Sequence, residues 1–294
     1  MGTKSGFVSI IGRPNVGKST FLNTVIGQKI AIVSNKPQTT RNRIQGIYTS
    51  DAGQIIFIDT PGIHKPRHKL GEYMVGVARA TLREADVILY MVEAGAEPGA
   101  GEEHIVDILK HTTTPVFLVV NKIDLVDQDE VSRSIRNFRL RMDFAEIVPV
   151  SAALGINIQP LLQKIFEYLP EGPLYYSPDD VTDQPERFVV AELIREKALH
   201  LTREEVPHSL AVEVEEMKPR TQGVMYVRAV IFAERDSQKG ILIGKGGSML
   251  KRIGEAARLD IENMLGVNTY LDLWVKVKKD WRNTEAHLKN FGYR

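Results

Sequence analysis

The chain has 294 residues, of which 43% are hydrophobic and 26% are charged, and its formal net charge is +1. This is the composition of a soluble globular protein long enough for two domains. Because the sequence contains no cysteine, a disulfide framework and a thiolate metal site are excluded. The first residues lack the apolar region of a signal peptide, and no apolar run reaches the roughly 18 residues that span a bilayer. We therefore expect a cytoplasmic protein.

The first 50 residues carry seven Lys or Arg and no Asp or Glu. An all-basic segment suits a surface that surrounds a polyanionic nucleotide or a nucleic acid. A solvated face without acidic residues is the alternative.

Short runs rich in Val and Ile alternate with helical patterns through the first 170 residues. The runs predict strands over residues 7–11, 54–58, 86–92, 115–120 and 146–150. The helical patterns cover residues 19–26, 71–83, 102–111, 130–143 and 158–168. This alternation predicts a doubly wound α/β sheet, whose ligands bind at the carboxyl ends of the strands.

The first predicted strand is followed by a phosphate-binding pattern, G-x-x-x-x-G-K-[ST]. The candidate phosphate-loop residues are Gly12, Arg13, Pro14, Asn15, Val16, Gly17, Lys18, Ser19 and Thr20. The glycines let the backbone turn so that its N–H groups cradle phosphate oxygens. Lys18 would reach the β- and γ-phosphates of a nucleoside triphosphate, and the Ser19 hydroxyl would bind Mg²⁺.

A Gln-Thr-Thr-Arg segment, residues 38–41, lies where a nucleotide-sensing loop is expected. A threonine in such a loop completes the Mg²⁺ shell when the γ-phosphate is present. We favour Thr40 for this role and keep Thr39 as the alternative. The basic loops 35–45 and 62–70 would be ordered together by the γ-phosphate, through Thr40 and Gly62.

The turn Asp59, Thr60, Pro61 and Gly62 directly follows a predicted strand. Asp59 would hold Mg²⁺ through a water molecule, and the backbone N–H of Gly62 would contact the γ-phosphate. The next residue is Ile63, where Ras-like proteins carry a glutamine that orients the attacking water. We therefore expect slow intrinsic turnover, with Lys18, Thr40, Gly62 and Asn15 as the candidate catalytic groups. Asn15 has two interpretations: it helps to hold a K⁺ ion against the phosphates, or it stabilises the turn.

A second nucleotide motif, N-K-x-D, is formed by Asn121, Lys122 and Asp124. The Asp124 carboxylate would accept two hydrogen bonds from the N1–H and the amine of guanine. Adenine would leave this carboxylate unpaired, so the motif predicts GTP and GDP as ligands. Lys122 would pack its stem over the base, and the pair Ser151 and Ala152 would supply a backbone N–H for the guanine carbonyl.

Residues 171–185 are rich in proline and acidic residues and predict a linker between a GTP-binding domain, 1–170, and a second domain, 186–294. In the second domain we expect a helix over 186–201, strands over 209–215 and 224–234, a short helix from Lys239, a long helix over 248–265 and a strand over 269–278. Trp274 alternates into the last strand, and we expect it in the core.

A G-x-x-G loop joins the two consecutive helices of the second domain. The candidate RNA-binding residues are Gly244, Lys245, Gly246, Gly247, Ser248, Lys251 and Arg252. KH modules clamp the backbone of about four nucleotides with such a loop. The helix that follows offers its N-terminus to phosphates, and the basic side chains add charge. A helix-helix turn with a solvated basic face is the alternative.

These motifs together resemble the Era family of bacterial GTPases, and the resemblance covers essentially the whole chain. It implies a P-loop GTPase domain with a doubly wound sheet, followed by an α+β KH domain of type II. It also implies a GTP-hydrolysing switch that uses Mg²⁺, binds the 3′ region of 16S rRNA and promotes maturation of the small ribosomal subunit. Peripheral association with the inner membrane is implied by resemblance alone, and no stable protein partner is evident. Gly246 stands where a second basic residue is often expected in this family.

Two other functions are weighed against this one. A nucleotide-gated RNA-binding module with vestigial hydrolysis would fit Ile63. A tRNA-modifying GTPase would share Asn15 and the paired threonines, but it would need a further catalytic domain that we do not find in the sequence.

Overall fold

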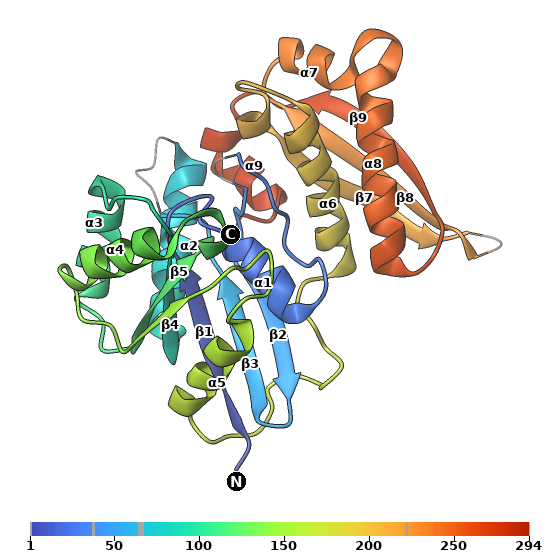
Figure 1. Ribbon diagram of the computed structural model, residues 1–294. Coiled ribbons are helices and arrows are strands. Elements are labelled where there is room, and N and C mark those ends of the chain that lie inside the picture. Colours follow the sequence, from blue (N-terminus) through green and yellow to red (C-terminus); the bar gives the residue numbers. More distant parts are fainter. Residues whose placement is uncertain (1, 37–38, 64–67, 221–222, 294) are drawn as a thin grey trace. The chain divides into compact units, whose positions relative to one another are not determined.

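The computed structural model describes residues 2–36, 39–63, 68–220 and 223–293 and contains two compact units (Figure 1). The first unit comprises Met1–Ala31, Thr40–Pro66 and Met74–Asp183. The second comprises Ile32–Thr39, Arg67–Tyr73 and Gln184–Arg294. Two short segments next to the nucleotide motifs therefore belong, by their contacts, to the second unit.

A six-stranded sheet forms the centre of the first unit, in the order β2-β3-β1-β4-β5-β6. Its strands are β1 (Lys4–Ile11), β2 (Ile44–Ser50), β3 (Gly53–Asp59), β4 (Val87–Glu93), β5 (Val116–Asn121) and β6 (Glu146–Pro149). All pairings are parallel except that of β2 with β3. The five predicted strands are present, and β2 was not predicted. Its central Gly46, which lowers strand propensity, lies against α1, where a Cβ would be 2.5 Å from Leu22 Cδ1.

Helices cover both faces of this sheet. They are α1 (Lys18–Ile26), α2 (Lys69–Glu84), α3 (Ala100–Leu109), α4 (Gln128–Arg139) and α5 (Ile158–Tyr168). Buried residues of α2, α3 and α4 pack on β4 and β5 in one hydrophobic cluster. On the other face, Phe21 of α1 contacts Phe57 of β3, and Tyr168 of α5 contacts Phe117 of β5. The carboxyl ends of the buried strands are thus held in fixed positions, and the nucleotide motifs follow them directly.

The predicted linker, residues 171–185, lies for the most part along the first unit instead of connecting two domains freely. The buried Gln54 side chain accepts hydrogen bonds from the N–H groups of Tyr175 and Tyr176, at 2.9 and 3.0 Å. The Ile47 N–H donates to Val181 O at 2.9 Å. A side-chain amide and the outer edge of β2 therefore satisfy backbone groups of this proline-rich segment, and the second unit resumes at Gln184.

The second unit has the predicted order α-β-β-α-α-β. Its elements are α6 (Glu186–Leu201), β7 (Ala211–Pro219), β8 (Met225–Ala233), α7 (Asp236–Ile243), α8 (Ser248–Leu265) and β9 (Thr269–Val277). The sheet order is β7-β8-β9, with β8 antiparallel to β7 and parallel to β9. A core cluster joins α6 and α8 to one face of this sheet. A short helix that was not predicted, α9 (Glu285–Asn290), follows.

The prediction that Trp274 is a core residue was wrong. Its side chain is 51% exposed, whereas Trp281 is fully buried and donates its indole N–H to Ser209 O at 2.9 Å. The alternation in β9 was recognised correctly, but it places Leu271, Leu273 and Val275 toward the helices and Trp274 on the opposite face.

α6 holds Val33 and Thr39, two described residues of the segment that belongs to the second unit. The Val33 N–H donates to Glu196 Oε1 at 2.9 Å, and His200 Nε2 lies 2.9 Å from Val33 O. The buried Arg195 guanidinium donates to Thr39 O. Gln38 lies outside the described residues. Within the described part of the chain, no helix is both long and apolar enough to cross a membrane.

Candidate nucleotide and RNA sites

The phosphate loop connects β1 to α1 and depends on a glycine in the left-handed region. Gly17 has φ +103°, and a Cβ there would lie 2.2 Å from Asn121 Nδ2. Only glycine fits both the backbone conformation and the contact. The Lys18 ammonium lies inside the loop and donates to Gly12 O at 3.2 Å and to Arg13 O at 2.8 Å. The loop therefore already surrounds the cation that phosphates would meet.

Lys18 and Asp59 are both buried, and burial works against the charge of each. Burial lowers the pKa of Lys18 to about 8, although the nearby Asp59 carboxylate opposes this change. Burial raises the pKa of Asp59, against the effects of Lys18 and of the Ser19 and Thr40 hydroxyls. Both groups would gain from ligands that restore their charged forms, which a phosphate and a cation would do.

Three oxygen-bearing side chains meet beside Lys18. Ser19 Oγ donates to Asp59 Oδ2 at 2.6 Å and lies 2.9 Å from Thr40 Oγ1. Thr40 Oγ1 donates to Asp59 Oδ2 at 3.3 Å. Asp59 Oδ1 is buried and has no hydrogen-bond partner among the described residues. Two hydroxyls and an unsatisfied carboxylate oxygen are ligands that Mg²⁺ accepts, so the residues present fit this ion.

The structure distinguishes between the two threonines. Thr40 lies next to Ser19 and Asp59, whereas the Thr39 hydroxyl donates to Lys36 O at 2.6 Å and the Thr39 carbonyl accepts from Arg195. The geometry therefore favours Thr40 over Thr39.

The turn after β3 lies against the phosphate loop. A Cβ on Gly62 would be 2.6 Å from Pro14 N, and the Ile63 N–H donates to Gly12 O at 3.3 Å. The buried Thr60 hydroxyl donates to Ile10 O at 2.8 Å, so it joins the ends of β1 and β3. Pro61 is also buried. The Ile63 side chain is 3% exposed and belongs to the core cluster with Ala78 and Leu82. The Ile63 side chain therefore points into the core and does not contact the position of an attacking water molecule.

Asn15 adopts the left-handed conformation, with φ +68°. Asparagine tolerates this region better than most residues, so the turn interpretation accounts for its presence without a cation. The K⁺ interpretation stays a prediction.

Asn121 connects the base motif to the phosphate loop. Its Nδ2 donates to Val16 O at 2.8 Å, and its Oδ1 accepts from the Ala152 N–H at 2.9 Å. Lys122 has φ +65° and pairs with Glu93 Oε2 at 2.7 Å. Asp124 is exposed after this turn. The Asn121 side chain thus holds the two nucleotide motifs at a fixed distance from each other.

The two backbone N–H groups predicted to meet the guanine carbonyl both make hydrogen bonds within the protein. The Ala152 N–H is engaged by Asn121, and the Ser151 N–H donates to Ile156 O at 3.2 Å. The next N–H, that of Ala153, makes no hydrogen bond to another described residue. The prediction that Ser151 and Ala152 supply a backbone N–H for the guanine carbonyl stays a prediction, and Ala153 is a further candidate.

Sequence reasoning also missed the partner of Arg13. Its Nη1 lies 3.0 Å from Glu102 Oε1, and the other Glu102 oxygen accepts from the Gly99 N–H at 3.0 Å. The largely buried Glu102 therefore ties the phosphate loop to the start of α3. No local pattern connects these residues, which are 89 positions apart.

In the second unit, the G-x-x-G loop joins α7 to α8. Gly244 has φ +72° and ψ 175°, and a Cβ there would lie 2.8 Å from Met249 N. Gly246 and Gly247 have no atom within 4 Å of a Cβ position and face open space. Lys245, Lys251 and Arg252 are exposed, and Ser248 begins α8. The loop thus presents backbone and positive charge to solvent, as a phosphate clamp requires.

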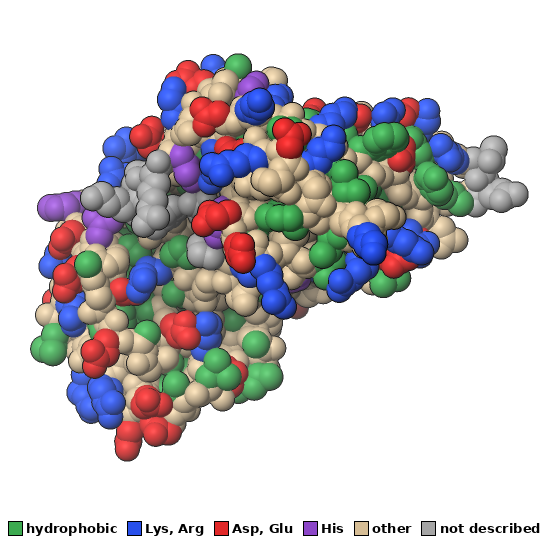
Figure 2. Space-filling model, turned by 90° about the horizontal axis from the view of Figure 1, so that it is seen from above, with side chains coloured by type: hydrophobic (Ala, Val, Ile, Leu, Met, Phe, Trp, Pro, Cys, Tyr) green, Lys and Arg blue, Asp and Glu red, His purple; other side chains and the backbone are tan. Residues whose placement is uncertain are grey.

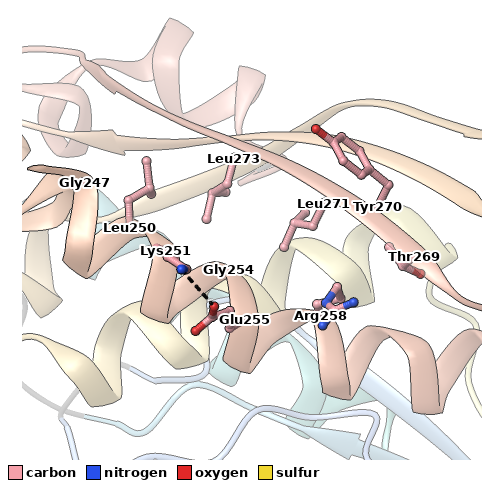
Figure 3. Close-up of a pocket in the computed structure, with 10 residues that line it drawn as sticks. All are labelled: Gly247, Leu250, Lys251, Gly254, Glu255, Arg258, Thr269, Tyr270, Leu271 and Leu273. Atoms are coloured by element: carbon pink, nitrogen blue, oxygen red, sulfur yellow. Dashed lines mark ion pairs between the residues drawn. The ribbon is translucent and has the colours of Figure 1, made fainter.

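A groove of about 460 Å³ runs from this loop along α8 and β9 (Figure 3). Gly254, in the middle of α8, leaves room over Leu273, and Arg258 adds a cation that sequence reasoning did not select. Arg252 does not line the groove, and Lys251 pairs loosely with Glu255 at 3.9 Å. A glycine inside a helix lowers the stability of the helix by about 1 kcal/mol relative to alanine. The need to leave space for a ligand would explain why Gly254 stands here.

The two loop glycines make a matched test of the clamp. Gly244→Ala is expected to lower RNA affinity at least tenfold and the free energy of unfolding by roughly 1–3 kcal/mol, because this backbone conformation is open to glycine alone. Gly246→Ala, in the left-handed region with free space, should cost only about 1 kcal/mol. Thermal unfolding and RNA titrations of both variants measure the difference, and equal effects would contradict the assigned geometry.

Comparison with known proteins agrees with the two-unit division. The model of a family described as "50S ribosome-binding GTPase" matches residues 7–122, and that of the "KH domain" matches residues 205–282. A variant of Aquifex aeolicus Era, solved with GDP·AlF4⁻, is 43% identical over 99% of both chains, with a TM-score of 0.96. The chain belongs to the Era family.

A second Era structure supports the same assignment. It is 42% identical over 99% of both chains, with a TM-score of 0.95, and holds MgGDPNP and nucleotides 1506–1542 of 16S ribosomal RNA. The predicted Era-type architecture, a P-loop GTPase domain followed by a KH domain, is thereby confirmed. The visible surface of this Era-family chain carries charges of both signs, in agreement with the net charge of +1. Figure 2 shows Lys and Arg side chains interspersed with Asp and Glu.

Proposed function

We propose that this chain is a GTP-hydrolysing molecular switch that binds the 3′ region of 16S rRNA and promotes assembly of the small ribosomal subunit. The observation that carries the proposal is that one chain combines the Ser19, Thr40 and Asp59 cluster with a G-x-x-G groove. Era-family relatives with GDP·AlF4⁻ and with MgGDPNP and 16S rRNA support it.

The phosphate loop, Gly12 to Thr20, would bind the GTP phosphates with its backbone and with Lys18. Mg²⁺, held through Ser19, Thr40 and Asp59, would supply charge neutralisation for the phosphates. Asp124 would select guanine, and the backbone near Ala152 and Ala153 would meet the guanine carbonyl. Asn121 would keep these groups at a fixed distance from the phosphate loop, because it donates to Val16 O.

Hydrolysis would proceed without a water-orienting side chain at position 63, because Ile63 is packed in the core. Backbone groups such as the Gly62 N–H, the Lys18 charge and a K⁺ ion near Asn15 would stabilise the transition state instead. Slow turnover in the absence of RNA or a partner is the expected consequence.

Thr39 and Thr40 give the switch a physical basis. Thr39 is bound by Arg195 of α6, and Thr40, the next residue, lies with Ser19 and Asp59. A change in the ligands of Thr40 would therefore move Thr39 and alter its hydrogen bond with α6. We infer a coupling free energy on the order of 1–3 kcal/mol between GTP and RNA, equal in both directions.

Phosphate release and RNA binding by the full chain test the proposal together. GTP, but not ATP, should be hydrolysed, faster in K⁺ than in Na⁺ buffer. A 37-nucleotide RNA with the sequence of the 16S rRNA 3′ region should bind with different affinities in GDP and in a non-hydrolysable GTP analogue. RNA binding without phosphate release would indicate a nucleotide-gated binding module, and equal RNA affinities would refute the switch.

The resemblance also implies a cytoplasmic location with peripheral membrane association, which belongs to the same proposal. Fractionation of cells that express the tagged full chain would test it.

A further inference from the structure

The sheet of the second unit has a face that its helices do not cover. Val227, Ala229 and Ile231 of β8 point into the core with α6 and α8. The alternate residues therefore point to the opposite face. At one end of that face, Phe232 contacts Phe291 at 5.0 Å between ring centroids, so the C-terminal segment covers it. The other end carries three aromatic side chains, two of them exposed and one, Tyr226, buried.

These side chains, Tyr226, Tyr270 and Trp274, form what we call the aromatic face. Tyr226 and Tyr270 are register partners, and their rings stack at 6.0 Å with an interplanar angle of 15°. Tyr270 is 56% exposed and Trp274 is 51% exposed. Large exposed aromatic groups on one surface of a domain usually mark an interaction site.

Asp272 fixes the orientation of two of these rings. Its Oδ2 accepts from the Tyr226 hydroxyl at 3.0 Å, and its Oδ1 accepts from Trp274 Nε1 at 2.8 Å. The Arg220 guanidinium lies 3.9 Å from the Tyr226 ring centroid and 5.3 Å from that of Tyr270. The aromatic face is thus ordered before any ligand binds, which lowers the entropic cost of binding.

Ion pairs hold most of the charged side chains around the aromatic face, and Arg228 shares Glu215 with a lysine, at 3.4 Å. Lys218 pairs with Glu216 at 2.6 Å, and Lys276 pairs with Glu215 at 2.8 Å. Paired charges attract a phosphate backbone less than free ones, and the Arg220 guanidinium is directed at the aromatic rings. A ligand of this face would therefore bind by stacking, as unpaired nucleobases do on aromatic rings and on arginine planes.

Tyr270 makes the aromatic face continuous with the RNA groove. It lines the groove, yet its side chain points away from α8, whereas Leu271 and Leu273 point toward that helix (Figure 3). β9 is an edge strand, so nothing in the sheet blocks the path around it. A G-x-x-G clamp holds about four nucleotides, whereas the Era complex contains nucleotides 1506–1542.

We propose that single-stranded RNA leaving the groove crosses the edge of β9 and stacks unpaired bases on Tyr270 and Trp274. This second RNA contact rests on the proposed RNA-binding function. Loss of one stacking ring should weaken the binding of RNA longer than the clamp by roughly 5- to 150-fold. Because stacking releases no counterions, the salt dependence of binding should stay unchanged.

The two tryptophans allow a direct measurement. Trp281 is buried and Trp274 is exposed, and the chain has no third tryptophan. The probe is a 37-nucleotide RNA with the sequence of nucleotides 1506–1542 of 16S rRNA. This RNA should quench tryptophan fluorescence of the full-length protein, and Trp274→Phe should remove the quenching while keeping most of the affinity. Trp274→Ala should weaken binding within the range above at an unchanged salt slope, and Leu259→Ala, which trims an exposed α8 side chain outside the groove, should behave as wild type.

The outcomes separate the two proposals. Unchanged affinity of Trp274→Ala together with absent quenching would overturn the aromatic face as an RNA contact. The same unchanged RNA affinity with weaker binding to intact small subunits would assign the face to a ribosomal protein and also overturn it. If wild-type protein does not bind the RNA, the proposed function itself fails.

Discussion

Lys18→Met is expected to abolish tight GTP binding and to remove a pH-dependent penalty on the stability of the ligand-free protein. In the wild-type loop, the Lys18 ammonium lies within hydrogen-bond distance of Gly12 O and Arg13 O, where phosphate oxygens would meet it. Two charge-assisted hydrogen bonds to phosphate contribute roughly 1.5–3 kcal/mol each. Affinity for GTP should therefore fall by about 10²- to 10⁴-fold, which a titration with a fluorescent GTP analogue would measure.

The stability of the ligand-free protein should change in the opposite direction. Because the pKa of Lys18 is lowered from 10.5 to about 8, its charged form destabilises the folded state, and this penalty is fully present below pH 8. Below pH 8 the penalty amounts to roughly 3 kcal/mol at most, and it is lost as the pH rises from about 8 to 10.5. The difference in the free energy of unfolding between Lys18→Met and wild type should therefore favour the variant at pH 7 and shrink over this window. A difference that does not depend on pH would contradict the burial of a charged lysine.

Asp124→Asn is expected to change the base that the protein selects. The Asp124 carboxylate would accept two hydrogen bonds from guanine, and an amide offers one donor in place of an acceptor. Loss of charged hydrogen bonds of about 1.5–3 kcal/mol each should reduce GTP affinity by roughly 10²-fold or more. Xanthosine triphosphate, which carries a carbonyl in place of the amine, should gain affinity.

Competition between the two nucleotides for the variant and the wild type measures this change. Asp127→Asn is a matched control, because Asp127 caps α4 through the Glu130 N–H and lies three residues away. Retained preference for GTP in Asp124→Asn would refute the assigned base site.

The parts of the fold and the site that the sequence predicts are those that depend on contiguous residues. The phosphate loop, the Asp59 turn and the N-K-x-D motif each need a fixed local spacing at the end of a buried strand, so pattern and structure agree. The central strands are predicted for the same reason, because their apolar runs are buried on both faces.

The features that sequence reasoning missed depend on contacts between distant residues. Glu102 reaches Arg13 only because α3 begins beside the phosphate loop. Residues 171–183 have a linker's composition, but the buried Gln54 side chain binds their backbone. Trp274 belongs to a strand whose alternation was recognised, yet alternation alone does not tell which face is covered. Such choices are made by tertiary packing.

The burial of Ile63 constrains how this enzyme can be altered. Introducing glutamine at this position, to imitate a Ras-like site, would put an amide among Ala78, Leu82 and their apolar neighbours. An unpaired buried amide costs about 1–3 kcal/mol, so the substitution would weaken the domain before it could place a water molecule. A site with a water-orienting glutamine and a site without one therefore differ in the packing of the core as well as in the residue at position 63. A change from one to the other would require the residues around position 63 to be redesigned together.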